Sequence, residues 1–118
     1  AWPPTSQDGS DAMQAFLEKG IAFDGLFCAT DTIAFGAIDA MHRAGIQIPE
    51  QVKVAAVGNN RMSAIYTPHL TSVNLSHRTG GLEAGAILMD MIQNGNDAIR
   101  MAQMQCRLYE RESTGANA

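Results

Sequence analysis

The chain has 118 residues, of which 46% are hydrophobic, and its formal net charge is −4. This length allows one domain with its own core, and no run of about 18 apolar residues is present to form a membrane-spanning helix. The eight Lys and Arg residues are scattered along the sequence, which excludes nucleic-acid binding through a basic stripe of this chain. The start has neither an initiator Met nor a signal segment, so we expect a processed chain or a piece of a longer one.

The amino-terminal region predicts one amphipathic helix followed by a strand. Thr5 or Ser6 can cap a helix over about residues 6–19, and Gly20 can end it. The continuously apolar segment Leu26–Ala29 is typical of a short, buried parallel strand.

The rest of the chain alternates between strands and helices. Strands separated by one helix indicate parallel βαβ winding, so the predicted fold class is α/β with a Rossmann-like parallel sheet. The expected elements are a helix over 32–44, a strand over 52–57, a helical turn over 61–66, a strand over 70–75, a helix over 79–93 and a strand over 106–111.

Polar residues follow two of the predicted parallel strands. Thr30 and Asp31 come after the first strand, and Gly58, Asn59 and Asn60 come after the second. Ligands of such sheets bind beyond the carboxyl ends of the strands, which predicts a small-molecule site here. Asp31 has two interpretations, because it can cap the helix that begins beside it or contact a ligand directly.

Catalytic and metal-binding patterns are not found in the sequence. It contains no nucleophile elbow, phosphate loop or dinucleotide fingerprint, so we expect no enzyme activity and no cofactor. The histidines have no ligand spacing around either cysteine, so we expect no metal. Cys28 and Cys106 are expected to be buried free thiols in a reducing compartment, and a disulfide between adjacent strands is the less favoured alternative.

Several short motifs, taken in order, resemble the lactose-repressor and galactose-repressor family of bacterial transcription regulators. The motifs are Leu26–Asp31, Gly45–Glu50, Tyr66–Val73 and Arg111–Thr114, and the similarity extends from about residue 6 to 114. The resemblance implies a bilobed, periplasmic-binding-protein-like effector domain behind an amino-terminal DNA-binding head. Residues 1–118 would be the carboxyl-terminal part of that domain, with a lobe core over about 6–75 plus the strand at 106–111. The helix at 79–93 would belong to the other lobe.

The resemblance also implies partners and site residues. We expect a cytoplasmic homodimer without membrane contact, which binds a sugar or sugar acid and reaches DNA only through the missing amino-terminal domain. The effector would lie against Thr30, Asp31, Gly58 and Asn59. The residues expected at the dimer interface are Ile33, Ala37, Met41, Ile65 and Tyr66.

One departure from the family concerns the effector site. Many members carry Gly, an aromatic residue and then Asp after the second strand, and that Asp binds sugar hydroxyls. Alignment on Pro68 puts Gly58 at the position of this Asp. The missing carboxylate lowers the repulsion of an anion, so a sugar acid is possible alongside a neutral sugar.

Two other functions are less favoured than a regulator. Part of a periplasmic sugar-binding transport protein would have the same architecture, but the motifs at Pro68–Val73 and Arg111–Thr114 favour the regulator. An enzyme on a flavodoxin-like sheet is the least favoured, because no catalytic constellation is present.

Overall fold

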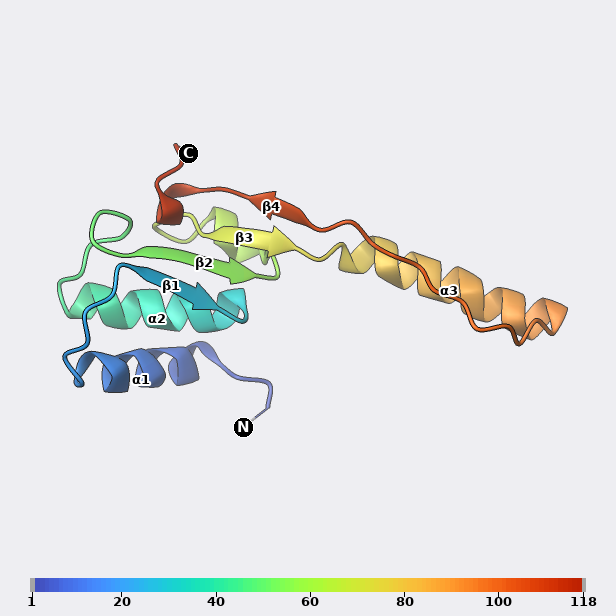
Figure 1. Cartoon of the computed structure of the whole chain (residues 1–118), viewed down its shortest axis with the longest axis horizontal. Helices are drawn as coiled ribbons and strands as arrows, with labels where there is room; N and C mark the ends of the chain where they lie inside the picture. The colour runs from blue at the N-terminus through green and yellow to red at the C-terminus, as the bar shows by residue number, and fades with distance from the viewer. Residues whose placement is uncertain (1, 118) are drawn as a thin grey trace.

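The computed structural model describes residues 2–117 and contains a four-stranded sheet in the order β1-β2-β3-β4 (Figure 1). β1 (Gly25–Cys28), β2 (Lys53–Val57) and β3 (Thr71–Asn74) run parallel, and β4 (Arg107–Tyr109) is antiparallel to β3. The predicted α/β class with a mostly parallel sheet is confirmed.

Two helices, α1 (Ser6–Leu17) and α2 (Asp31–Arg43), form a layer beneath the sheet, with α2 against the strands and α1 against α2 (Figure 1). Both begin at a threonine cap. The Thr5 hydroxyl accepts from the backbone N–H of Asp8 at 3.2 Å, and the Asp8 carboxylate accepts from the Thr5 N–H at 2.6 Å. The helices predicted over 6–19 and 32–44 are therefore confirmed, each within two residues at either end.

Glycines allow α1 and α2 to approach each other closely. A Cβ added to Gly36 would lie 1.7 Å from the Ser6 carbonyl oxygen, and one added to Gly9 would lie 2.2 Å from the Ile33 carbonyl oxygen. Any larger residue would collide with the backbone of the neighbouring helix. The small residues of α2 therefore serve a helix–helix contact inside the chain.

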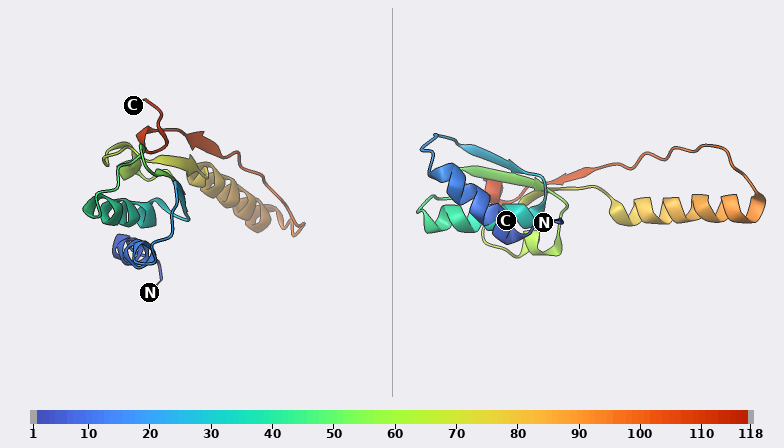
Figure 2. Two further views of the ribbon diagram at one scale, coloured as in Figure 1. Left: turned by 60° about the vertical axis from the view of Figure 1, so that its left-hand side comes forward. Right: turned by 90° about the horizontal axis from the view of Figure 1, so that it is seen from below.

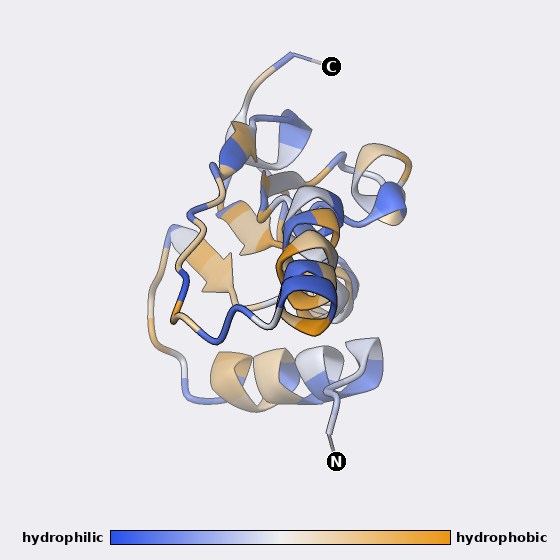
Figure 3. Ribbon diagram, turned by 90° about the vertical axis from the view of Figure 1, so that its right-hand side faces the viewer, coloured by the Kyte–Doolittle hydropathy of each residue, from blue (hydrophilic) through white to orange (hydrophobic). Residues whose placement is uncertain are grey.

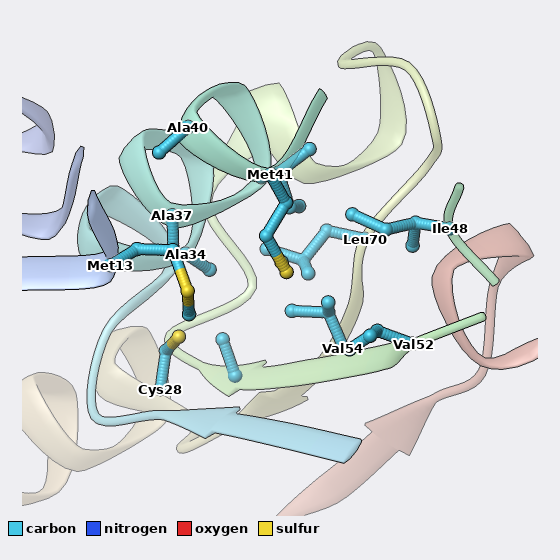
Figure 4. Close-up of a cluster of buried hydrophobic side chains, with 12 residues drawn as sticks. Met13, Cys28, Ala34, Ala37, Ala40, Met41, Ile48, Val52, Val54 and Leu70 are labelled. Carbon is cyan, nitrogen blue, oxygen red and sulfur yellow. The ribbon is translucent and has the colours of Figure 1, made fainter. Parts of the chain in front are cut away.

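The core lies between α2 and the sheet (Figure 4). Ile38 and Met41 of α2 are fully buried, as are Val54 of β2 and Leu70 just before β3. Met13 of α1 joins them at the margin of the same cluster. This single apolar layer fixes the position of α2, and with it the loop that precedes α2.

The opposite face of the sheet is uncovered, and β1 is an edge strand. Cys28 faces the helices and is 5% exposed, whereas the side chain of Phe27 points the other way and is 68% exposed. Leu108 of β4 is also exposed, at 53%. The prediction of a parallel strand at Leu26–Ala29 is confirmed, but its predicted burial is wrong except at Cys28, because the helices of the described residues 2–117 cover only one face of this sheet.

The third helix, α3 (His77–Asn94), extends away from the sheet and has no buried residue (Figures 1 and 2). The chain then runs back alongside α3 to reach β4. An ion pair between Asp90 and Arg100 links the helix to this returning segment. Seen from its end, α3 carries hydrophobic segments on its exposed surface (Figure 3). The predicted helix over 79–93 is confirmed, and the strand predicted over 106–111 is shorter, since only three of its residues pair with β3.

Two short 3-10 helices complete the chain, η1 (Arg61–Ala64) between β2 and β3 and η2 (Glu112–Thr114) after β4. Both cysteines are free, but only Cys28 is buried; the prediction of burial is wrong for Cys106, which lies exposed before β4. Burial raises the pKa of the Cys28 thiol to about 11. Within residues 2–117, no helix combines the length and the apolar character needed to cross a membrane.

Candidate functional site

The carboxyl ends of the three parallel strands meet at one edge of the sheet, which we call the carboxyl edge. It is formed by the residues that end or follow β1, β2 and β3, namely Thr30, Asp31, Gly58, Asn59, Asn60 and Asn74. The four residues predicted to contact the effector are thus brought together, although they come from two separate loops. Gly58 lies beside Asp31: a Cβ added to Gly58 would be 3.8 Å from the Asp31 carboxylate.

Asp31 is the anchor of this edge. It is 2% exposed, and its carboxylate accepts hydrogen bonds from the Asn60 N–H at 2.6 Å and from the hydroxyls of Ser63 and Ser72 at 2.5 Å each. These bonds tie the loop after β2 and the strand β3 to the start of α2. A buried carboxylate requires such donors, because burial without them would be costly.

The contacts of Asp31 distinguish a helix cap from a different role. The cap of α2 is Thr30, whose hydroxyl accepts from the Ile33 N–H at 3.3 Å. The Asp31 carboxylate instead points away from its own helix, toward the loop after β2 and β3. The capping role expected for Asp31 is therefore filled by its neighbour, and the carboxylate organises the carboxyl edge.

The loop after β2 has an unusual backbone. Gly58 has φ +132°, a conformation that L side chains rarely adopt, and its N–H donates to the Val73 carbonyl at 2.8 Å. Asn59 follows in the left-handed region at φ 49°, which Asn tolerates better than most residues. The Asn59 N–H donates to the Ser72 hydroxyl at 2.9 Å. The chain therefore turns sharply here, and the Asn59 side chain is held at the edge of the sheet.

Arg111 belongs to the site, and the sequence reasoning did not assign it that role. Its guanidinium donates to the Asn59 Oδ1 and to the Leu70 carbonyl, both at 2.6 Å, and it lies 5.3 Å from the ring centre of Tyr109. In the sequence, Arg111 is only the first residue of the motif Arg111–Thr114. Its contact with Asn59 joins residues 52 positions apart, which no local pattern reveals.

The residues predicted for a dimer interface fall into two groups. Ala37 and Met41 are 3% and 0% exposed and pack in the core, so they leave no surface for a partner. Ile65 is 66% exposed, Ile33 is half-buried, and Tyr66 is half-buried against Phe35 with ring centres 4.9 Å apart. Of the five predicted interface residues, these last three have surface that a second copy could contact.

A separate hollow of about 330 Å³ lies at the free edge of β1, where α1 passes beneath it. Its lining includes Phe16, Phe23 and Phe27, and among the residues that the structure describes its side chains are apolar apart from the Cys28 thiol. Ligand sites for polar molecules need a few placed polar groups to orient the ligand. The carboxyl edge has such groups and this hollow has none.

This chain is similar in sequence to a known domain family and to known transcriptional repressors. The model of the periplasmic binding protein-like domain family matches residues 2–114. The transcriptional repressor PurR of Pasteurella multocida is 28% identical over 107 residues, and that of Salmonella typhi is 31% identical over the same length. Each alignment covers 91% of this chain, which spans about a third of the length of these relatives (32% and 31%).

Solved structures give the same result. The transcription regulator GntR from Chromobacterium violaceum is 32% identical with a TM-score of 0.88, covering 97% of this chain and 42% of that one. A LacI-family regulator from Enterococcus faecium, solved with bound ribose, is 26% identical with a TM-score of 0.84, covering 93% and 40%. The fold, including the projecting α3, is thus shared with much longer regulator chains.

Proposed function

The chain belongs to the periplasmic binding protein-like family, among the domains of lactose-repressor-type transcription regulators, and we propose that it is the effector-sensing and dimer-forming part of a bacterial DNA-binding repressor. Its effector is a small sugar-type molecule that lies against the carboxyl edge. The protein acts in the cytoplasm, and its DNA contacts come from residues outside 1–118.

The observation that carries this proposal is the fixed polar edge of the sheet. Thr30 bonds the Ile33 N–H, Asn59 is held by Ser72 and Arg111, and Asn60 is held by Asp31. Their free polar atoms therefore have set positions before a ligand arrives. Preorganised groups of this kind reduce the entropy lost on binding. Ligands of parallel α/β sheets bind at this edge.

Effector binding can control a repressor by changing the balance between two conformations. A ligand held between this edge and a second lobe would favour the closed arrangement, and the shift equals its difference in affinity for the two states. Ile33, Ile65 and Tyr66 lie near the surface of α2 and η1, and we assign them to the dimer contact. The similarity to named repressors supports a regulator over a transport protein.

A thermal-shift screen tests the proposal. Neutral sugars, including ribose, and sugar acids are added to the chain, and an effector should raise the melting temperature by linkage. Asn59→Gly, which keeps the left-handed backbone and removes the side chain, should abolish the increase, whereas Asn96→Gly, on the turn beyond α3, should not. If no compound raises the melting temperature, or if Asn59→Gly leaves every increase unchanged, the proposal is wrong.

A further inference from the structure

We propose that the carboxyl edge recognises hydrogen-bond acceptors, and that its effector carries a carboxylate, as a sugar acid does. The inference rests on the proposed function and deepens it by naming the class of effector. It follows from which polar atoms at this edge are already bonded within the chain and which are free.

Three asparagines at this edge have their amide oxygens occupied. Asn59 Oδ1 accepts from the Arg111 guanidinium at 2.6 Å, Asn60 Oδ1 from the Met62 N–H at 3.0 Å, and Asn74 Oδ1 from the Ser76 N–H at 2.8 Å. Each partner is a donor only, so the amide orientation is fixed by chemistry. The Nδ2 group of each asparagine therefore remains to donate, and no acceptor within residues 2–117 bonds to it.

The other oxygens of the edge are also engaged. The Asp31 carboxylate is buried and accepts three hydrogen bonds, while the Ser72 hydroxyl donates to it and accepts from the Asn59 N–H. The Thr30 hydroxyl accepts from the Ile33 N–H, which leaves its proton free to donate. The unused hydrogens at this edge are therefore those of the three Nδ2 groups and the Thr30 hydroxyl, whereas each side-chain oxygen named here already accepts at least one hydrogen bond.

A positively charged residue, Arg107, lies at the carboxyl edge as well. Arg107 pairs in register with Asn74 and so sits at the carboxyl edge, and its guanidinium lies 4.9 Å from the ring centre of Tyr109, which Arg111 also contacts. Within residues 2–117, neither arginine forms an ion pair, whereas Arg43 and Arg100 pair with Asp39 and Asp90. An incoming carboxylate would meet donors and an unneutralised cation.

A neutral polyol fits this edge less well than a carboxylate. A polyol hydroxyl can accept from an Nδ2 group, but its own proton then needs an acceptor, and the side-chain oxygens of this edge already accept hydrogen bonds within the chain. A carboxylate only accepts, through two oxygens, and hydrogen bonds to an ionised acceptor are the stronger kind. The structure thus favours an acceptor-rich anion at this position.

The test is a titration of the ¹⁵N-labelled chain with D-gluconate and with D-glucitol, which differ only in having a carboxylate or a CH₂OH group at C1. We expect saturable shifts of the Thr30, Asn59 and Asn60 amides, with gluconate binding about tenfold more tightly than glucitol. Asn59→Asp keeps one oxygen on Arg111 and replaces the free NH₂ with a second oxygen, so it should remove this preference.

Asn96→Asp is the matched control, because the Asn96 Oδ1 also accepts a backbone N–H, here from Ala98, but at the far end of α3. It adds the same charge and should leave the preference for gluconate unchanged. Equal affinities for the two ligands, tighter binding of glucitol, or equal weakening by both variants would overturn the inference while leaving a binding site at this edge. No shift of these amides with any sugar or sugar acid would overturn the proposed function as well.

Discussion

At the scale of single residues, the site depends on a buried carboxylate, that of Asp31, which forms no ion pair within residues 2–117. Asp31 accepts two hydroxyl protons and one backbone N–H, which come from η1, β3 and the loop after β2. The sequence predicted Thr30, Asp31, Gly58 and Asn59 at this edge because strand ends can be recognised locally. It did not predict the partners Ser63 and Ser72, because these contacts join residues 32 and 41 positions apart.

Asp31→Asn should destabilise the chain although it changes only one atom. The amide NH₂ would face donors that the carboxylate now accepts, which leaves at least one buried donor without a partner. We expect a loss of about 2 kcal/mol in the free energy of unfolding, measured with urea. Asp24→Asn, on the exposed loop before β1, is the control and should stay within about 0.5 kcal/mol of the original chain. Similar losses for both variants would contradict the anchoring role of Asp31.

The two cysteines should differ sharply in reactivity. Cys28 is 5% exposed and burial raises its pKa to about 11, so at pH 8 its thiol stays protonated and shielded from reagents. Cys106 is exposed. Mass spectrometry after brief treatment with iodoacetamide should show modification of Cys106 alone, and of both residues in urea. Rapid modification of Cys28 in the native chain would mean that the core around β1 opens readily.

At the scale of elements, the features set by neighbouring residues were predicted from the sequence, whereas those set by distant parts of the chain were not. Helix boundaries were predicted to within two residues at either end because caps such as Thr5 act over a single turn. The burial of β1 was not predicted correctly, since it depends on what covers the second face of the sheet. The close contact of α1 with α2 was predicted in part. The small residues of α2 indicated that this helix packs closely against the sheet or another helix, but they did not show that the neighbour is α1.

Gly36→Ala should separate α1 from α2. The new Cβ would lie 1.7 Å from the Ser6 carbonyl oxygen, so the helices must move apart and lose packing around Met13. We expect a loss of about 3 kcal/mol in the free energy of unfolding. Gly85→Ala is a control of the same chemistry in α3, where nothing lies within 4 Å, and it should not lower stability. A neutral Gly36→Ala would show that the two helices are not in close contact.

At the scale of the whole molecule, the apolar side chains of α3 are not covered by the rest of the described chain. The chain extends 60 Å along its longest axis, and Leu82, Met89 and Ile92 of α3 are 69%, 49% and 67% exposed. Soluble proteins rarely leave such a face uncovered. The sequence predicted the helix from its apolar spacing and placed it in another lobe by resemblance, but an apolar stripe does not identify what covers it.

We expect the chain to cover α3 with a second copy, by exchange of the element between two chains. Light scattering should then give a dimer or a larger species, and Leu82→Glu combined with Met89→Glu should change that state. Gln93→Glu, which adds charge to α3 without removing apolar surface, is the control and should leave the state unchanged. A monomer at every concentration, with α3 protected from hydrogen exchange, would contradict this expectation.

The central claim is that a small-molecule effector binds at the carboxyl edge, and mapping of amide shifts tests it most directly. The ¹⁵N-labelled chain is titrated with whichever compound raises its melting temperature most. The account predicts that the largest shifts fall on Thr30, Asn59 and Asn60. Shifts concentrated instead at the apolar hollow, on Phe16, Phe23 and Leu26, would contradict it.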